Sequence, residues 1–121
     1  MAKFLVIDDS KLARKKQEET ITAAGHEVVA TAENGQIGVE KYKEFNPDFV
    51  TLDLEMPVLN GLETTKAIMA HDPEAKIIIV SSVIKKTSIR EVLDAGAIFN
   101  LKKPFKPEML QLQVARYIAE S

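Results

Sequence analysis

The chain has 121 residues, with 16 Lys and Arg against 18 Asp and Glu, which gives a net charge of −2 at pH 7. This length is typical of one domain, so we expect a single domain over residues 1–121. With 45% hydrophobic residues the chain can bury a core, which excludes a disordered protein. The weakly acidic balance argues against nucleic acid as a partner, and the absence of cysteine excludes disulfides and thiolate metal sites.

Membrane insertion is not expected from the sequence. No apolar run approaches the roughly 18 residues of a membrane helix. The N-terminal apolar run at 4–7 is followed at once by Asp8 and Asp9, which a secretory signal would not tolerate. We therefore expect a cytoplasmic protein.

Apolar segments alternate with helix-like segments along the chain. In chain order we predict strand 3–8, helix 10–24, strand 27–32, helix 36–45, strand 48–53, helix 61–71, strand 76–81, helix 86–95, strand 97–102 and helix 107–119. The first and fourth strands are apolar without alternation, which is typical of parallel strands covered on both faces. Regular alternation of strand and helix predicts an α/β fold with a parallel sheet and right-handed crossovers.

The predicted helices carry start and stop signals. Ser10 is a suitable N-cap for the first helix, and Gly25 and Gly96 are residues of the kind that close helices in a left-handed conformation. Asn46 and Asp72 each precede a proline, which disfavours the helical conformation in the residue before it. These signals support the helix boundaries given above.

The first predicted helix has a weak apolar face. Its inward stripe of Leu12, Ala13, Ile21 and Ala24 is interrupted by Lys16 and Gln17. The simpler interpretation is that both polar side chains lie along the edge of the core with their polar ends in water. The alternative is that this helix presents a surface to a partner.

Polar residues follow four of the predicted strands, at the edge where parallel sheets form their sites. They are Asp8 and Asp9, Asp53, Ser81 and Ser82, and Lys102 and Lys103. The two histidines, His26 and His71, have no second ligand at metal-binding spacing, and we expect both at the surface.

Three carboxylates at one edge require a cation, because two unit charges about 4 Å apart repel by roughly 4 kcal/mol at an effective dielectric near 20. Oxygen ligands without histidine or thiolate favour a hard divalent ion, and Mg²⁺ suits a site that completes its shell with phosphoryl oxygen. An ionised aspartate that faces Mg²⁺ and a lysine is a nucleophile for a phosphoryl group.

Four motifs stand in order along the chain: FLVIDDS at 4–10, LDLEMP at 52–57 with Asn60 and Gly61, VSS at 80–82, and Gly96 and Ala97 followed by KPF at 103–105. Together they resemble the motifs of response-regulator receiver domains, and most of all those of the single-domain, CheY-like receivers of chemotaxis. The resemblance implies a flavodoxin-like (βα)5 fold, a doubly wound parallel five-stranded sheet of order 2-1-3-4-5 with helices on both faces.

The resemblance also implies roles for the acidic residues. Asp53 matches the phosphoacceptor. Asp9 and Asp53 match direct ligands of Mg²⁺, the backbone carbonyl of Glu55 matches a third ligand, and Asp8 matches a residue that acts on the metal largely through water.

Lys103 matches the lysine that contacts the phosphoryl group, with a cis peptide bond to Pro104, and Ser81 matches the switch hydroxyl. One position departs from the family pattern. Asn100 stands where receivers usually have Tyr or Phe, and strand alternation points Phe99 to the opposite face. An output that depends on burying an aromatic ring at this position is therefore in question.

The implied function is a switch that accepts a phosphoryl group from a histidine kinase onto Asp53 in a two-component, chemotaxis-like pathway. Such a domain catalyses only its own phosphorylation and dephosphorylation. The resemblance places its output on the face formed by helix 86–95, strand 97–102 and helix 107–119. The expected partners of this monomer are the kinase, a downstream target such as the flagellar motor switch, and a phosphatase.

Three alternatives remain open at this point. A pseudo-receiver would bind partners without phosphorylation. A phosphoaspartyl hydrolase also uses an aspartate followed two residues on by an acid, as Asp53 is followed by Glu55. A flavin carrier would need a phosphate-binding loop where Asp8 and Asp9 stand, and two acids there repel phosphate.

Overall fold

A computed structural model describes residues 1–54, 56, 59–82 and 86–119 of the chain. Parallel strands form one sheet in the order β2-β1-β3-β4-β5. The strands are β1 (Lys3–Ile7), β2 (Glu27–Ala32), β3 (Phe49–Asp53), β4 (Ile77–Ser81) and β5 (Phe99–Lys102). This confirms the predicted doubly wound, flavodoxin-like sheet.

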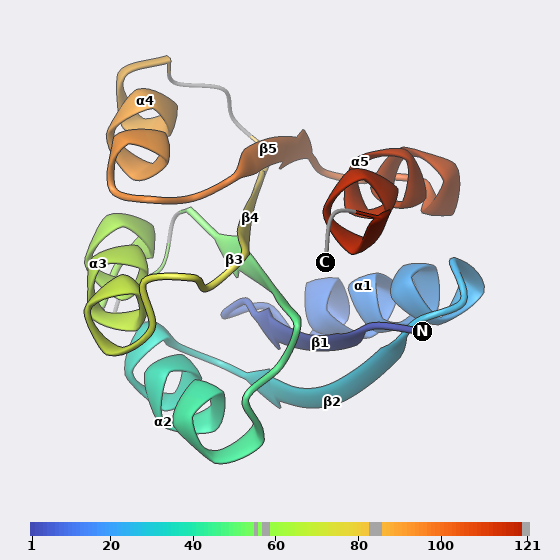
Figure 1. Cartoon of the computed structure of the whole chain (residues 1–121), viewed down its shortest axis with the longest axis horizontal. Coiled ribbons are helices and arrows are strands. Elements are labelled where there is room, and N and C mark those ends of the chain that lie inside the picture. Colours follow the sequence, from blue (N-terminus) through green and yellow to red (C-terminus); the bar gives the residue numbers. More distant parts are fainter. Residues whose placement is uncertain (55, 57–58, 83–85, 120–121) are drawn as a thin grey trace.

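Helices cover both faces of this sheet (Figure 1). On one face lie α1 (Lys11–Ala23) and α5 (Pro107–Ala119), and on the other lie α2 (Gly35–Phe45), α3 (Gly61–His71) and α4 (Lys86–Asp94). Among the described residues, no helix has the length and apolarity that crossing a bilayer requires.

The core has two halves, one on each face of the sheet. Successive strand residues alternate between them, because side chains along a strand point to opposite faces. Val6 and Val80 pack with Ile21 of α1 and Leu110 of α5. Leu5, Ile7, Leu52 and Ile79 pack on the other face with Tyr42 of α2, Ile68 of α3 and Val92 of α4. Burial on both faces explains why β1 and β4 are apolar without alternation.

The helix boundaries follow the predicted signals closely. Ser10 caps α1 by accepting a hydrogen bond from the backbone N–H of Ala13, and Gly25 and Gly96 have φ of 91° and 125°. The strand ends differ slightly from the prediction. β1 ends at Ile7 rather than at residue 8, and β5 begins at Phe99 rather than at residue 97.

The start of α3 packs tightly against the residue that follows β3. The backbone N–H of Gly61 donates to the carbonyl of Leu54 at 3.2 Å. A Cβ atom at position 61 would lie 2.8 Å from Leu54 Cα, so only glycine fits without a shift. Asn60 and Glu63 form a capping box at this helix end. This contact fixes the chain just beyond Asp53.

The prediction that His26 lies at the surface is wrong. Its side chain is only 6% exposed. Nδ1 accepts a hydrogen bond from the backbone N–H of Ala2 at 3.0 Å, so Nε2 carries the proton and donates to Gln111 Oε1 at 2.6 Å. His26 therefore joins the N-terminus to α5. His71 is exposed, as expected.

A hydrogen bond between Tyr42 and Asp72 ties α2 to the end of α3, and its strength should depend on pH. The Tyr42 hydroxyl donates to Asp72 Oδ2 at 2.7 Å. This bond lowers the pKa of Asp72 from its ordinary 3.8, and burial together with the same bond raises the pKa of Tyr42. A lowered carboxylate pKa stabilises the fold above about pH 4, and this contribution is lost as the pH falls further.

We expect Tyr42→Phe to reduce the free energy of unfolding by about 1 kcal/mol near neutral pH. The difference from wild type should be smaller at about pH 3, because the stabilising contribution of the Asp72 charge is lost progressively as the pH falls below its ordinary pKa of 3.8. Urea unfolding at both pH values measures this, with Tyr117→Phe as the control. A deficit of equal size at both pH values would show that the Asp72 charge contributes nothing.

Candidate functional site

Three aspartates meet at the carboxyl edge of the sheet. Asp8 and Asp9 directly follow β1, and Asp53 ends β3, which pairs with β1 in parallel. One carboxylate oxygen of each residue lies within 4.8 Å of the others. Asp8 is fully buried, Asp53 is 8% exposed, and Asp9 is exposed. The structure thus brings together the three carboxylates that the sequence places at this edge.

Asp8 is held by hydrogen bonds on both carboxylate oxygens. Oδ1 accepts from the backbone N–H of Ser10 at 3.0 Å. Oδ2 accepts from Gln17 Nε2 at 3.0 Å and from Lys103 Nζ at 2.5 Å. The Arg14 guanidinium donates to the Asp8 carbonyl at 2.7 Å. These hydrogen bonds on both oxygens restrict the rotation of the carboxylate.

Lys103 lies between two of the carboxylates. Its Nζ is 2.5 Å from Asp8 Oδ2 and 3.7 Å from Asp53 Oδ1, and its side chain is 21% exposed. The loop after β5 supplies this lysine, and the backbone N–H of Lys103 donates to the Ser81 carbonyl at 2.9 Å. The peptide bond from Lys103 to Pro104 is cis, as the family resemblance implied. At 3.7 Å from Asp53 Oδ1, the ammonium group is placed to contact a group bound at Asp53.

Ser81 and Ser82 both lie at this edge of the sheet but differ in burial. Ser81 ends β4 with 1% of its surface exposed, whereas Ser82 is exposed. In the sheet register Asp53 pairs with Val80, so Ser81 comes directly after the residue beside Asp53. Both serines are thus placed near the acids, and only Ser81 is enclosed by the fold.

Asn100 and Phe99 occupy opposite faces of β5. The Phe99 ring stacks on Tyr117 of α5, with 6.2 Å between centroids. Asn100 pairs with Ile79, which belongs to the core half beneath α3 and α4. The Asn100 Oδ1 is buried without a hydrogen-bond partner among the described residues. The predicted orientation of Phe99 away from the switch position is therefore confirmed.

The acid cluster fits a hard divalent cation. Two carboxylate oxygens within 4.8 Å of each other carry charges that repel by at least roughly 3 kcal/mol at an effective dielectric near 20. The Lys103 ammonium offsets only part of the charge of three acids, and all three offer the oxygen donors that hard cations prefer. Glu55, whose backbone carbonyl is the remaining predicted ligand, lies outside the described residues.

Gln17 is a part of the site that the sequence reasoning missed. It is 5% exposed, so its polar end does not lie in water along the core edge, while Lys16 is exposed as expected. Its amide bonds to Asp8 instead. The available signal was its position, a polar residue on the inward stripe of a helix that begins just after two acids.

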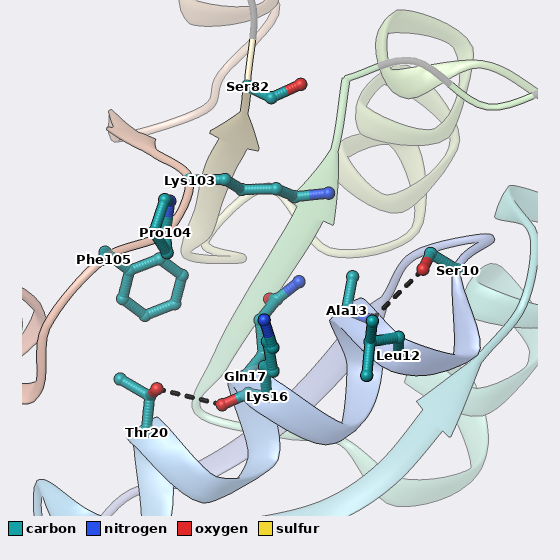
Figure 2. Close-up of a pocket in the computed structure, with 10 residues that line it drawn as sticks. All are labelled: Ser10, Leu12, Ala13, Lys16, Gln17, Thr20, Ser82, Lys103, Pro104 and Phe105. Atoms are coloured by element: carbon teal, nitrogen blue, oxygen red, sulfur yellow. Dashed lines mark hydrogen bonds between the residues drawn. The ribbon is translucent and has the colours of Figure 1, made fainter.

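A groove of ≈320 Å³ opens beside the site, between α1 and the loop after β5. Figure 2 shows the amide of Gln17 and the ammonium of Lys103 at this groove. Leu12, Pro104 and Phe105 give it apolar walls. Leu12 is 64% exposed, so its predicted place in the inward stripe of α1 is wrong. The first turn of α1 lines the groove rather than the core.

Known proteins are similar to this chain in both sequence and structure. Residues 4–115 match the response regulator receiver domain. The chemotaxis protein CheY of Thermotoga maritima is 44% identical over 105 residues, which cover 87% of this chain and 88% of that protein. CheY of Bacillus subtilis is 38% identical over 106 residues, which cover 88% of each protein.

Solved structures of CheY proteins are also similar to this chain. Chemotaxis protein CheY4 from Vibrio cholerae has a TM-score of 0.86 at 32% identity, covering 96% of this chain and 98% of that chain. The complex of CheX and CheY with BeF3 and Mg²⁺ from Borrelia burgdorferi has a TM-score of 0.89 at 30% identity, covering 96% of this chain and 88% of that chain. The family match, the close relatives and the acid cluster beside Lys103 identify this chain as a CheY-like member of the response regulator receiver domain family.

Proposed function

We propose that this domain, over residues 1–121, is a phosphorylation-activated switch of two-component chemotaxis signalling, in which Asp53 accepts the phosphoryl group. One observation carries the proposal: Asp53 stands at the sheet edge within 4.8 Å of two further carboxylates and 3.7 Å from Lys103 Nζ. A carboxylate between a cation site and an ammonium group is well placed to attack phosphorus.

In the proposed transfer, an Asp53 carboxylate oxygen attacks the phosphorus of a phosphohistidine on a histidine kinase. The O–P bond forms as the N–P bond breaks. The imidazole nitrogen keeps the electron pair of the broken bond and takes up a proton from solvent, which leaves an acyl phosphate on Asp53. Lys103 Nζ donates a hydrogen bond to a phosphoryl oxygen and stabilises the charge of the transferring group.

We propose Mg²⁺ as the cation, with Asp9 and Asp53 as direct ligands, the Glu55 carbonyl as a third, and Asp8 acting through water. When bound, Mg²⁺ neutralises charge on the phosphoryl oxygens. The division between Asp8 and Asp9 is supported by their surroundings: Asp8 already accepts hydrogen bonds on both oxygens, whereas Asp9 is exposed.

The Ser81 hydroxyl is our candidate for the switch. Ser81 is buried, and it directly follows Val80, the residue of β4 that pairs with Asp53. The signal would leave through the face formed by α4, β5 and α5, where Leu93 and Met109 are 38% and 47% exposed. Because Asn100 replaces the usual aromatic residue, we expect this output to rely on Ser81.

The proposed partners of this monomeric, cytoplasmic domain are a histidine kinase, a downstream target such as the flagellar motor switch, and a phosphatase. The CheY of Borrelia burgdorferi forms a complex with the protein CheX, which supports the binding of protein partners by this domain. Nothing in the comparisons favours a pseudo-receiver or a hydrolase, and we propose no turnover of an external substrate.

The test is phosphorylation of the purified chain by acetyl phosphate. With Mg²⁺, intact mass spectrometry should show one added phosphoryl group, and with EDTA none. Borohydride reduction converts an aspartyl phosphate to homoserine, so peptide sequencing should find homoserine at position 53. Modification at another residue would refute the acceptor assignment, and no uptake at all would favour the pseudo-receiver.

A further inference from the structure

Gln17 is an unusual residue for its position on α1. It is 5% exposed, between the exposed Lys16 and the exposed Glu18. Its Nε2 donates to Asp8 Oδ2 at 3.0 Å. Its Oε1 is buried and finds no hydrogen-bond donor among the described residues. A buried acceptor without a partner costs stability, and an apolar side chain would avoid that cost. The amide therefore points to a role other than stability.

The orientation of the amide follows from the charge of Asp8. The Lys103 ammonium contacts the same oxygen, Asp8 Oδ2, at 2.5 Å, and an ionised carboxylate can only accept hydrogen bonds. Nε2 must therefore face Asp8, and Oε1 must face away from it. Oε1 therefore has no partner among the described residues because the other end of the amide, Nε2, donates to Asp8.

Lys103 and Gln17 both donate to Asp8 Oδ2, but a phosphoryl group on Asp53 would draw only Lys103 away from that oxygen. Lys103 Nζ must then contact the group on Asp53, whose Oδ1 is now 3.7 Å away. When the ammonium leaves Asp8, Oδ2 keeps a donor only because Gln17 remains, since the other recorded bond, from Ser10, goes to Oδ1. A neutral amide also adds no positive charge that would oppose a metal ion.

We propose that Gln17 is a positioning residue that holds Asp8 while Lys103 moves from Asp8 to the phosphoryl group on Asp53. This inference rests on the proposed function, because it assigns a role in the phosphorylated state. Without Gln17 the buried Oδ2 would depend on Lys103 alone, so the lysine would be retained and the phosphorylated state disfavoured.

The first test separates metal binding from phosphoryl binding. Gln17→Met removes the amide at similar volume, and Gln36→Met makes the same change at an exposed position of α2. In the proposal Lys103 leaves Asp8 only for a phosphoryl group, so calorimetry should show less than about a threefold change in Mg²⁺ affinity. Binding of the phosphoryl mimic beryllofluoride at saturating Mg²⁺, followed by ¹⁹F NMR, should weaken about tenfold, as expected for loss of a hydrogen bond to a charged group.

Two outcomes of this test would overturn the proposal. Equal weakening of Mg²⁺ and beryllofluoride binding would show that Gln17→Met only loosens Asp8. Unchanged beryllofluoride binding would show that Asp8 Oδ2 needs no donor from Gln17 when Lys103 moves to the phosphoryl group. The control Gln36→Met should match wild type in both measurements.

A second test uses the metal-free protein and does not depend on phosphorylation. Lys103→Met imitates the state in which the ammonium has left Asp8. The effect of Gln17→Met on the urea midpoint should be more unfavourable in that background than with Lys103 present, because Oδ2 then loses its last donor. Additive effects would refute the sharing of Oδ2. If wild type takes up neither phosphoryl group nor beryllofluoride, the proposed function fails, while this cycle still tests the link between Gln17 and Lys103.

Discussion

Asp53→Asn is expected to abolish uptake of a phosphoryl group from acetyl phosphate in the presence of Mg²⁺. The amide nitrogen and oxygen are poor nucleophiles, and the change also removes one of three carboxylates from the cluster. The loss should be complete within the detection limit of intact mass spectrometry. The fold should survive, because asparagine has nearly the shape of aspartate and the substitution reduces charge repulsion at the sheet edge.

The matched control is Asp94→Asn, the same change at an exposed carboxylate of α4. It should take up one phosphoryl group at the rate of wild type. Circular dichroism and urea unfolding of Asp53→Asn verify that the loss is chemical. Uptake by a folded Asp53→Asn at the wild-type rate would move the acceptor to another residue.

The elements were predictable because their signals are local. Buried parallel strands are continuous apolar runs, and capping residues, glycines and prolines mark the helix ends, so the predicted boundaries lie within a few residues of those observed. The strand order came instead from the resemblance to receivers, since spacing along the chain does not determine which strands are neighbours. The edge with the acids was predictable because parallel strands end on the same side.

The stripe pattern of a helix does not predict the burial of the polar residues His26 and Gln17, because their burial depends on hydrogen-bond partners in other elements. His26 is buried by Ala2 and by Gln111, which lies 85 residues away. Gln17 is buried because Asp8, nine residues away, offers it an acceptor. A helical stripe pattern treats such positions as interruptions, although here each supplies a hydrogen bond that joins two elements.

Loss of Mg²⁺ binding should be much larger for Asp9→Asn than for Asp8→Asn. The two substitutions make the same chemical change at adjacent residues, so the comparison isolates position. Asp9 is exposed, and its carboxylate has no recorded hydrogen bond to a described residue, so it is free to bind a metal directly. Asp8 is fully buried and accepts from the backbone of Ser10, from Gln17 and from Lys103.

Isothermal titration calorimetry measures both affinities. For Asp8→Asn we expect a loss of about tenfold, the lower end of the roughly 10–100-fold that an outer ligand contributes, and for Asp9→Asn a loss above that range. The buried Asp8 is also the main partner of Lys103, so Asp8→Asn should lower the urea midpoint, whereas Asp9→Asn should not. Stability and metal affinity would thus respond to opposite members of the pair. If Asp8→Asn were the more damaging change for Mg²⁺, Asp8 would be the direct ligand, and its bond to Lys103 would have to break before the metal could bind.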